Sequence, residues 1–444
     1  MVAAELAPYA RETDAADAVP ALSKALRQLG HGVTVALPRY PGFEEHGLFV
    51  ARRLSPLPVG SSGITVFDGQ LASGVELVLF DGPGLFDRAG VFGDRAGEYS
   101  DNDKRFAFLG QAAAALVRQR AEQNKPFAVV HAHDWPGALA IAELGTGAPP
   151  TVLTIHDVRR QGAALKAGLA AAGAVTTVSP TYARSFSVAE HVGGSLSAAF
   201  EGLREPVVGI SHGIDYAVYN PATDPVLDAR YDAEDAANKA RTKGAMLRHL
   251  GLELDLSRPL VVLAGELSRE HGTDLVLDAL PELMKYDVAL VIAGKGEDFD
   301  AALAAARQEY PETFAYVPSL DDATFRRLNA AADVVLAPAR YEPASTGPMI
   351  AARYGAVPVA HASGGYLDTV VDCDPELETG TGFLFESPTA DSLLSAVGRA
   401  LTAYANEAGF NRLRRRLMRL DSSWDRPARR YLRTYQRLIE GDER

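Results

Sequence analysis

A chain of 444 residues, 47% of them hydrophobic and 23% charged, has a globular composition but is too long for one ordinary hydrophobic core, so we expect two domains. Its net charge of −13 disfavours nucleic acid and anionic membranes as the main partners, because both are polyanions, whereas a neutral sugar chain meets no such penalty. The single cysteine, Cys373, excludes an internal disulfide and a cysteine-based metal cluster. No run reaches the roughly 18 apolar residues of a membrane span. We therefore expect a cytoplasmic protein.

The first half of the chain alternates short β-branched runs with Ala- and Leu-rich stretches, which predicts a parallel sheet with crossover helices. The expected strands are 32–37, 75–80, 127–132, 150–156 and 174–179. Ahead of them, "MVAAELAPYA" offers only a few strand residues before a helix expected at 16–29. A doubly wound domain normally has its first strand complete and central. Either this domain tolerates a shortened strand, or the true start of the chain lies upstream of Met1.

From residue 222 to residue 250 the sequence is polar and charged, which predicts an interdomain connection or a helix along a cleft. The strand pattern then begins again, with runs at 259–266, 288–296, 314–319, 332–339 and 357–363. Because the same alternation occurs twice, we expect an α/β fold of two Rossmann-like domains that face a central cleft. The expected boundaries are 1–216 for the first domain, 217–257 for the connection, 258–424 for the second domain, and 425–444 for a closing helix that returns to the first domain.

Ligands of open parallel sheets bind at the carboxyl ends of the strands, and polar side chains follow several of the predicted strands. The stretch "HAHDWPGALA" places His131 and His133 between a strand and a helix. Two histidines could begin a metal site, but the sequence shows no third ligand nearby, so a hydrogen bond to a polar ligand is the favoured functional interpretation. The alternative, a capped helix with a satisfied histidine, stays open.

Two stretches of the second half also combine a predicted strand end with residues suited to a ligand. "RYEPASTGPMIAARYG" puts Glu342 in a loop between a strand and a helix, where the carboxylate could act on a ligand, brace the loop or cap the helix. "SGGYLDTVVD" offers Gly364 and Gly365, whose lack of side chains allows a ligand to approach the backbone. A glycine pair alone is weak support for a site.

The turn in "AGELSREHGTDLVLDAL" joins a buried strand to an amphipathic helix, a place where backbone N–H groups and the helix dipole favour a phosphate. Glu266 and Glu270 nevertheless put carboxylates there. Arg269 and His271 are the cations that the turn itself supplies. The turn is therefore shaped for an anion but carries negative charge of its own.

Read together, these stretches resemble the bacterial glycogen synthase and plant starch synthase family, retaining glucosyltransferases of the two-Rossmann-domain GT-B fold. The most specific pieces are "ALSKALRQLGHGVTVALPRY", "HAHDWPGAL", "TVSPTYARS", "GISHGIDYAVYNPATDP" and "ARYEPASTGPMIAARYGAVPVAHASGGYLDTVVD". The resemblance implies transfer of glucose from ADP-glucose to the end of an α-1,4-glucan. It implies a nucleotide sugar and an α-glucan as partners, with no metal and no other cofactor.

The resemblance also implies roles for individual residues. His133 would contact the donor sugar and Glu342 would lie near the reacting sugar, which makes these two the expected catalytic residues. His212 stands where the family has an asparagine. The expected donor-binding residues are Arg11, Asp17, Gly364, Gly365 and Thr369.

The departures from the family pattern gather around the donor diphosphate. Glu266 and His271 occupy the positions of the Arg and Lys that clamp the pyrophosphate. The family's glycine-lined Lys-Thr-Gly-Gly-Leu-Gly loop appears here as residues 11–16, with Asp14 in it, and Pro348 lacks the backbone N–H of the residue it replaces. A phosphate charge within about 4 Å of a carboxylate costs about 4 kcal/mol at an effective dielectric constant of about 20.

Acidic side chains are also favourable at helix starts, where they accept hydrogen bonds from free N–H groups. We therefore expect Glu266, Asp14 and Asp17 to take over part of the electrostatic role of a bound diphosphate. On the acceptor side, the family's long insertion between 162 and 174 is reduced to a short link, which changes the expected glucan groove.

Three functions are compatible with this sequence. The first is a glucosyltransferase whose ADP-glucose activity is weakened, altered in its donor or lost. The second is a non-catalytic pseudoenzyme that binds a glucan or a protein partner, such as an active synthase. The third is an enzyme that uses a donor without a diphosphate, such as a sugar phosphate.

Overall fold

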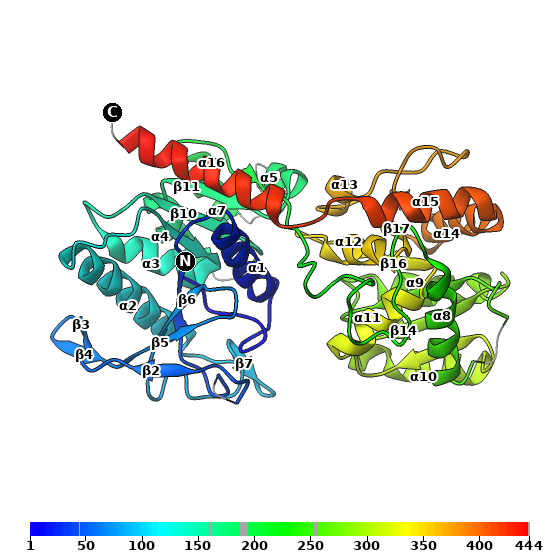
Figure 1. Cartoon of the computed structure of the whole chain (residues 1–444), viewed down its shortest axis with the longest axis horizontal. Helices are drawn as coiled ribbons and strands as arrows, with labels where there is room; N and C mark the ends of the chain where they lie inside the picture. The colour runs from blue at the N-terminus through cyan, green and yellow to red at the C-terminus, as the bar shows by residue number, and fades with distance from the viewer. Residues whose placement is uncertain (44, 160–161, 187–193, 253–254, 443–444) are drawn as a thin grey trace. The chain divides into compact units, whose positions relative to one another are not determined.

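The computed structural model describes residues 1–43, 45–159, 162–186, 194–252 and 255–442, and the chain forms two compact units (Figure 1). The first unit contains Met1–His212 and Trp424–Arg444, and the second contains Gly213–Ser423. Each unit is an α/β structure with parallel strands at its centre. None of the helices in the described ranges combines the length and the hydropathy that a membrane crossing requires.

The first unit carries two four-stranded sets of strands and two small two-stranded sheets. The order of one set is β12-β11-β10-β9, all parallel, and the order of the other is β1-β6-β5-β2, in which β1 is parallel to β6 and β5 is antiparallel to both β6 and β2. The strands are β1 (Thr34–Pro38), β2 (Val50–Arg52), β3 (Leu57–Val59), β4 (Ser62–Ile64), β5 (Val66–Gln70), β6 (Glu76–Phe80), β7 (Gly93–Asp94), β8 (Gly97–Glu98), β9 (Val130–His133), β10 (Thr151–Ile155), β11 (Ala174–Thr177) and β12 (Val208–Gly209). The helices are α1 (Ala15–Gln28), α2 (Asn102–Glu122), α3 (Asp134–Leu144), α4 (Gly162–Ala171), α5 (Pro180–Ser185), α7 (Gly194–Glu201) and α16 (Asp425–Asp442).

The last helix, α16, belongs to the first unit and packs against α1. Trp424, Ala428 and Tyr431 form a buried cluster with Leu22 and Leu26 of α1. Figure 1 shows α16 in red, running past α1 and the strands β10 and β11. The helical spacing of these apolar residues explains the packing, because positions three and four apart share one face of a helix.

The second unit has one parallel sheet in the order β15-β14-β13-β16-β17-β18. Its strands are β13 (Leu260–Ala264), β14 (Ala289–Ala293), β15 (Phe314–Val317), β16 (Val334–Ala337), β17 (Val357–His361) and β18 (Phe383–Phe385). Its helices are α8 (Ala237–His249), α9 (Thr273–Leu283), α10 (Glu297–Glu309), α11 (Asp322–Ala331), α12 (Thr346–Arg353), α13 (Tyr366–Thr369), α14 (Ala390–Ala405) and α15 (Glu407–Arg419). The second unit has hydrophobic clusters on both faces of this sheet. Val261 of β13 packs in one of these clusters and Val262 packs in another, as expected for a strand buried on both faces.

The segment 217–257, expected as a connection between domains, lies inside the second unit in the structure. Lys239 of α8 donates to two backbone carbonyl oxygens of this unit, at 2.8 and 3.0 Å. Lys243, one turn later, forms a 2.7 Å ion pair with Asp333, and both side chains are buried. These contacts fix the segment on the second unit, because a buried ammonium group is stable only where acceptors surround it.

Candidate functional site

Four histidines of the first unit form a row along the carboxyl edge of the strand set β12-β11-β10-β9. They are His131 and His133 on β9, His156 directly after β10, and His212 after β12. Successive ring centroids lie 4.2, 5.5 and 5.1 Å apart. The row follows from the topology, because the carboxyl ends of parallel strands meet at one edge of a sheet.

The histidine rings of this row are buried and neutral. Burial lowers the pKa of His131 and of His212 to about 3, and it lowers the pKa values of His133 and His156 well below their usual value. His133 Nδ1 lies 3.2 Å from His156 Nε2. Among the described residues, His133 Nε2, His156 Nδ1 and His212 Nε2 find no hydrogen-bond partner. Neutral imidazoles can exchange hydrogen bonds with a hydroxyl group, but they supply no charge to hold an anion.

Within the ranges that the structure describes, no group of three or more His, Cys, Asp and Glu side chains could hold a metal ion. The histidine row therefore fits hydrogen bonding to a polar ligand better than metal binding.

The loop at residues 11–16 is occupied by carboxylates of the protein itself, but not by the ones expected. Glu5 accepts hydrogen bonds from two backbone N–H groups of this loop, at 2.5 and 2.9 Å, and burial raises its pKa to about 7. Glu12 accepts from the backbone N–H groups of residues 91 and 92. Asp14, at the N-cap of α1, makes no side-chain capping bond. Asp14 thus stands at the helix start, as expected, but does not accept a capping hydrogen bond there, and its electrostatic role stays a prediction.

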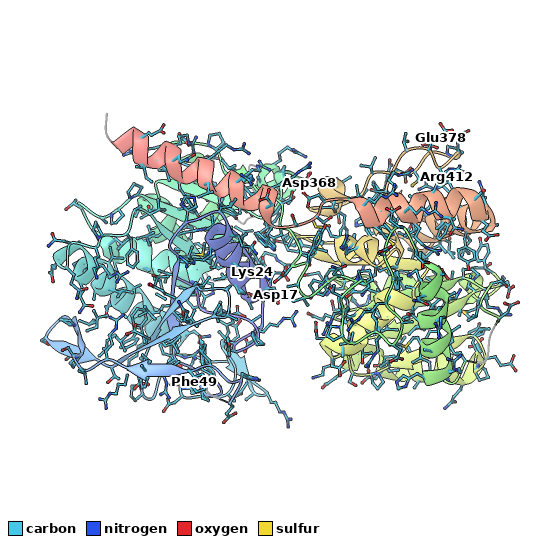
Figure 2. All side chains as sticks on the ribbon, in the orientation of Figure 1. Asp17, Lys24, Phe49, Asp368, Glu378 and Arg412 are labelled. Carbon is cyan, nitrogen blue, oxygen red and sulfur yellow. The ribbon has the colours of Figure 1, made fainter. Side chains whose placement is uncertain are left out.

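Arg11 and Asp17, two of the expected donor-binding residues, form an ion pair with each other. Arg11 Nη2 lies 2.9 Å from Asp17 Oδ2, and the two side chains are 49% and 51% exposed. Asp17 stands in the first turn of α1, where a negative charge is favourable to the helix dipole, and Figure 2 labels it there. The pair holds the Arg11 charge next to a carboxylate, so a donor phosphate would have to compete with Asp17 for it.

In the second unit, the turn between β13 and α9 brings Glu266 and His271 near each other. Glu266 has a side chain that is 72% exposed, and its Oε1 lies 4.0 Å from His271 Nδ1. The same ring nitrogen lies 2.8 Å from Ser268 Oγ. Helix α9 begins at Thr273 with Gly272 at its N-cap. Glu266 therefore lies in the turn ahead of the helix start and not at its N-cap, and its electrostatic role stays a prediction.

Two arginines beside this turn are bound by a carboxylate of α9. Arg340 Nη1 and Nη2 lie 2.7 and 2.9 Å from the two oxygens of Asp274, a two-pronged pair. Arg269 approaches the same carboxylate at 3.7 Å. Because a two-pronged pair is strongly bound, a diphosphate at the turn would compete with Asp274 for Arg340, whereas Arg269, 83% exposed, is only weakly held.

Glu342 lies in the loop between β16 and α12, and its carboxylate braces that loop. Glu342 Oε1 accepts hydrogen bonds from the backbone N–H groups of Ala344 and Ser345, at 3.2 and 3.1 Å. Its backbone carbonyl accepts from the N–H of Gly365 at 2.8 Å. Ser345 Oγ lies 2.7 Å from Thr369 Oγ1. The structure thus brings together the predicted residues of this unit, apart from those at the turn before α9.

Pro348 is buried in the first turn of α12, which begins at Thr346. The N–H groups of a first helical turn have no partner within the helix and are the donors that bind phosphate. A proline at this position removes one such donor without disturbing the helix. The start of α12 therefore offers an anion fewer N–H groups than the family pattern does.

Gly364 packs against the Glu342 loop in a way that a larger residue would disturb. Its φ is +47°, and an added Cβ would lie 2.2 Å from the carbonyl oxygen of Glu342. We expect Gly364→Ala to lower the free energy of unfolding by about 1–3 kcal/mol, measured by denaturant titration. Gly347→Ala is the matched control, because an added Cβ there meets nothing within 4 Å, and its effect should stay within about 0.5 kcal/mol. Equal effects of the two substitutions would contradict this role of Gly364.

Sequence reasoning missed Glu5, Glu12 and Asp274 as parts of the site. The partners of two of them are remote in the chain: Glu12 and Val91 are 79 positions apart, and Arg340 and Asp274 are 66 positions apart, whereas Glu5 binds residues seven and eight positions further on. No local pattern indicates such pairs. For part of the histidine row a signal did exist, because His133 follows the strand predicted at 127–132 and His156 ends the strand predicted at 150–156, whereas no strand was predicted ahead of His212.

The two-unit chain has solved counterparts. The catalytic domain of starch synthase IV from Arabidopsis thaliana, bound to ADP and acarbose, matches with a TM-score of 0.87 at 25% identity and covers 99% of this chain and 98% of that chain. HepE from Anabaena in complex with UDP matches with a TM-score of 0.61 at 15% identity over 98% of this chain and 99% of that chain, a likeness of fold alone. The fold is that of the GT-B glycosyltransferases, and the prediction of an α/β protein with two Rossmann-like domains is confirmed.

Sequence comparison identifies the family within this class. Residues 1–200 match the starch synthase catalytic domain, and residues 251–415 match the glycosyl transferases group 1. The glycogen synthases of Anaeromyxobacter sp. strain Fw109-5 and Syntrophotalea carbinolica are 36% and 31% identical to this chain, over 98% and 99% of it and over 98% of each relative. The chain belongs to the glycogen synthase and starch synthase family of glycosyltransferases, as its motifs predicted.

Proposed function

We propose that this chain is a glucosyltransferase of the glycogen synthase type whose transfer from ADP-glucose to an α-1,4-glucan is weakened, altered in its donor or lost. The starch synthase IV structure named above contains ADP and acarbose, which supports a nucleotide sugar and a glucan as the ligands of this fold. The observation that carries the proposal is the exposed Glu266 beside His271 at the turn before α9. By resemblance, an Arg and a Lys belong at these two positions.

The chemistry explains why this pair matters. When the bond between glucose and the diphosphate breaks, negative charge develops on the diphosphate, and cations already in place lower the barrier. A carboxylate about 4 Å from a phosphate opposes this by about 4 kcal/mol at a dielectric constant of about 20, before screening by salt. His271 is bound to Ser268, and Arg340 is bound to Asp274 by two hydrogen bonds, while Arg269 approaches the same carboxylate at 3.7 Å and is 83% exposed. The turn therefore presents the Glu266 carboxylate to solvent, with Arg269 as its more accessible arginine.

The sugar-binding residues of the family pattern are kept. In this proposal, the buried His133 Nε2, which has no partner among the described residues, exchanges a hydrogen bond with a hydroxyl group of the donor sugar. Glu342 lies near the reacting carbon, where a carboxylate stabilises positive charge on the sugar as the donor bond breaks. Both residues act by positioning and by electrostatics, and neither role needs a metal.

A second candidate function is non-catalytic binding of a glucan or a protein partner. The bonds of Glu5 and Glu12 favour it, because these carboxylates bind backbone N–H groups in and beside the loop at residues 11–16. The family pattern has in that loop a glycine-lined approach to the donor. In this chain, the loop is held in place by internal bonds.

The test compares this chain with the Anaeromyxobacter glycogen synthase in one assay of ADP release from ADP-glucose, with maltoheptaose as the acceptor. We expect turnover at least about a hundredfold lower for this chain, the usual effect of losing one group that stabilises developing charge. Turnover equal to that of the relative would contradict the proposal. Calorimetry with maltoheptaose and parallel assays with UDP-glucose and glucose 1-phosphate then separate the glucan binder from an enzyme with another donor.

A further inference from the structure

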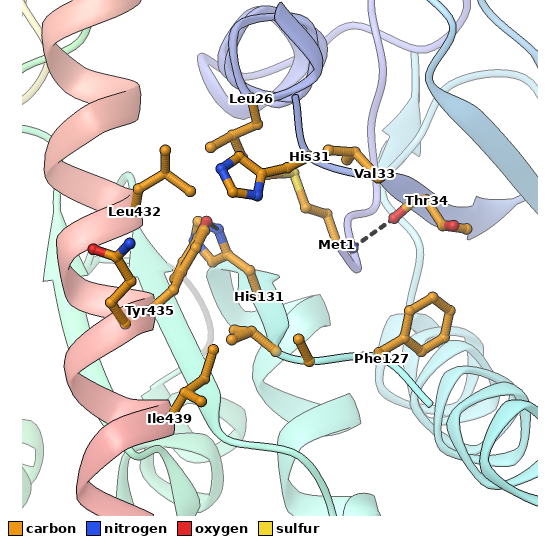
Figure 3. A pocket seen from close by; sticks show the side chains of 14 residues that line it. Met1, Leu26, His31, Val33, Thr34, Phe127, His131, Leu432, Tyr435 and Ile439 are labelled. Atoms are coloured by element: carbon orange, nitrogen blue, oxygen red, sulfur yellow. Dashed lines mark hydrogen bonds between the residues drawn. The ribbon is translucent and has the colours of Figure 1, made fainter. Parts of the chain in front are cut away.

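The strand set β1-β6-β5-β2 of the first unit has one covered edge and one open edge. At β1, the N–H of Ala36 donates to the carbonyl oxygen of Met1 at 2.8 Å. The amino group of Met1 donates in turn to the carbonyl oxygen of Thr34 at 2.6 Å, the bond drawn in Figure 3. At the other end of the order, β2 pairs with β5 on its inner side, and none of the strands in the described ranges pairs with its outer side.

The hydrogen bonds of β2 show which of its backbone groups point outward. The N–H of Arg53 donates to the carbonyl oxygen of Val66 at 2.9 Å. Residues of an antiparallel pair alternate between bonded and non-bonded positions, so Ala51 also bonds with β5. Val50 and Arg52 therefore turn their N–H and C=O groups away from β5, toward the open edge. Such a row of outward groups is a template for a further strand.

Two large apolar side chains stand exposed at the ends of this edge. Phe49, directly ahead of β2 and labelled in Figure 2, is 94% exposed, and Leu54, shortly after β2, is 103% exposed. Edge strands are usually protected from pairing by proline or by exposed charge. Residues 46–55 contain no proline, and the charge of Arg53 is neutralised by Asp68, whose two oxygens lie 2.8 and 2.7 Å from Nε and Nη2. This edge therefore has little of the usual protection.

The outward groups and the exposed side chains are arranged symmetrically about Ala51. When β2 is paired antiparallel with the β2 of a second copy, Val50 of each copy bonds with Arg52 of the other, and the two Ala51 residues lie opposite each other. The small side chain of Ala51 suits this position, because the Cα atoms of a non-bonded pair come within about 4.5 Å. Phe49 then lies opposite Arg53 of the other copy. A guanidinium group already held by its carboxylate partner is a favourable neighbour for an aromatic ring.

From these observations we infer that two copies of the chain associate through β2, which pairs antiparallel with the β2 of the second copy about a two-fold axis at Ala51. The two strand sets then form one continuous sheet, and each copy supplies the contact that the exposed Phe49 of the other lacks. Two-fold pairs of this kind are the commonest oligomers of soluble proteins. One strand covers less than the roughly 800 Å² that each partner buries in a standard interface, so we expect a weak dimer. The inference is independent of the proposed function, since it concerns association alone.

Analytical ultracentrifugation of the full chain, between about 1 and 300 µM, measures this association. We expect a dimer with a dissociation constant of about 10–100 µM. Phe49→Asp should raise this constant at least about tenfold, because two aromatic side chains lose their contacts. The matched control is Val371→Asp, which also replaces an exposed apolar residue by aspartate but lies in the second unit, and it should change the constant by less than about twofold. A chain that stays monomeric at 300 µM, or a dimer that both variants weaken equally, would contradict the inference.

Exchange of charge at Ala51 tests the register of the pairing. Ala51→Glu and Ala51→Lys each place two like charges opposite each other in the self-paired dimer, so each variant alone should stay monomeric where the wild-type chain dimerises. An equal mixture of the two should dimerise, because opposite charges then meet. Ala51 is exposed, so the melting temperatures of both variants should stay within about 2 °C of that of the wild-type chain. The inference is wrong if either variant dimerises alone as the wild-type chain does, or if the mixture of the two folded variants stays monomeric.

Discussion

Replacing Glu266 by arginine and His271 by lysine in one variant is expected to raise the affinity of the chain for ADP by about two to three orders of magnitude. Each new cation about 4 Å from a phosphate contributes about 4 kcal/mol at a dielectric constant of about 20, and the lost carboxylate removes a similar opposing effect. Exposure of the turn and screening by salt reduce these values, since the Glu266 side chain is 72% exposed. After these reductions, a gain of about 3–4 kcal/mol in the free energy of ADP binding remains. This gain corresponds to two to three orders of magnitude in affinity, at about 1.4 kcal/mol for each factor of ten.

Titration calorimetry with ADP measures this gain, and its dependence on salt identifies its origin. Between roughly 0.05 and 0.3 M salt the gain should shrink, because screening weakens attraction between exposed charges. The control is Asp278→Arg with Glu282→Lys on α9, which makes the unit more basic away from the turn, by one positive charge more than the test variant. Equal gains in the two variants would show that net charge, and not the clamp, sets the affinity. A restored affinity together with restored transfer from ADP-glucose would show that the clamp is what the chain lacks.

The central strands could be predicted closely from the sequence. The run predicted at 288–296 contains β14, whose residues are buried throughout, and the run at 259–266 contains β13. Such strands are buried on both faces, so they consist of continuous apolar runs that stand out from their polar surroundings. The ends of the strands depend on hydrogen bonds to neighbouring strands, and the predicted runs are accordingly longer than the strands.

The edge of the first unit was not predicted. Strand β2 has residues of intermediate or full exposure, and Phe49, next to it and labelled in Figure 2, is 94% exposed. Strand β5 pairs antiparallel with β6 although its residues are mostly not buried. Apolar periodicity is weak in such segments, because an edge strand forms through pairing with its neighbour more than through burial.

Within the candidate site, the sequence indicated which loops matter but not which carboxylates fill them. Asp14 was expected to serve the start of α1, whereas Glu5 and Glu12 bind the N–H groups in and near the preceding loop. Glu12 reaches N–H groups 79 and 80 positions away through the fold, so the sequence contains no local signal for its contacts. Glu5 binds the loop from seven and eight positions earlier in the chain, a longer spacing than that of a capping residue, which bonds two or three positions on.

Replacing Asp333 by alanine is expected to destabilise the second unit by about 3–5 kcal/mol, the usual cost of removing one partner from a buried ion pair. One carboxylate oxygen accepts from Lys243 at 2.7 Å and from the N–H of Leu260 at 3.0 Å, and the other lies 3.0 Å from Arg414 Nη2. The Lys243 side chain is 4% exposed. Without Asp333, two cations from α8 and α15 would stay close together in the interior with no anion between them.

Chemical denaturation of the full chain measures this loss, with two variants as references. Asp333→Asn keeps acceptor oxygen but no charge, so its effect should fall between those of the wild-type chain and the alanine variant. Glu282→Ala removes an exposed ion pair with Lys285 and should change stability by no more than about 0.5 kcal/mol. Limited proteolysis within 217–257 adds the decisive reading. If the segment in Asp333→Ala becomes cleavable at the denaturant concentration at which the second unit unfolds, α8 folds as part of that unit. If the segment becomes cleavable while the unit stays folded, it behaves as the connection that its polar sequence suggests.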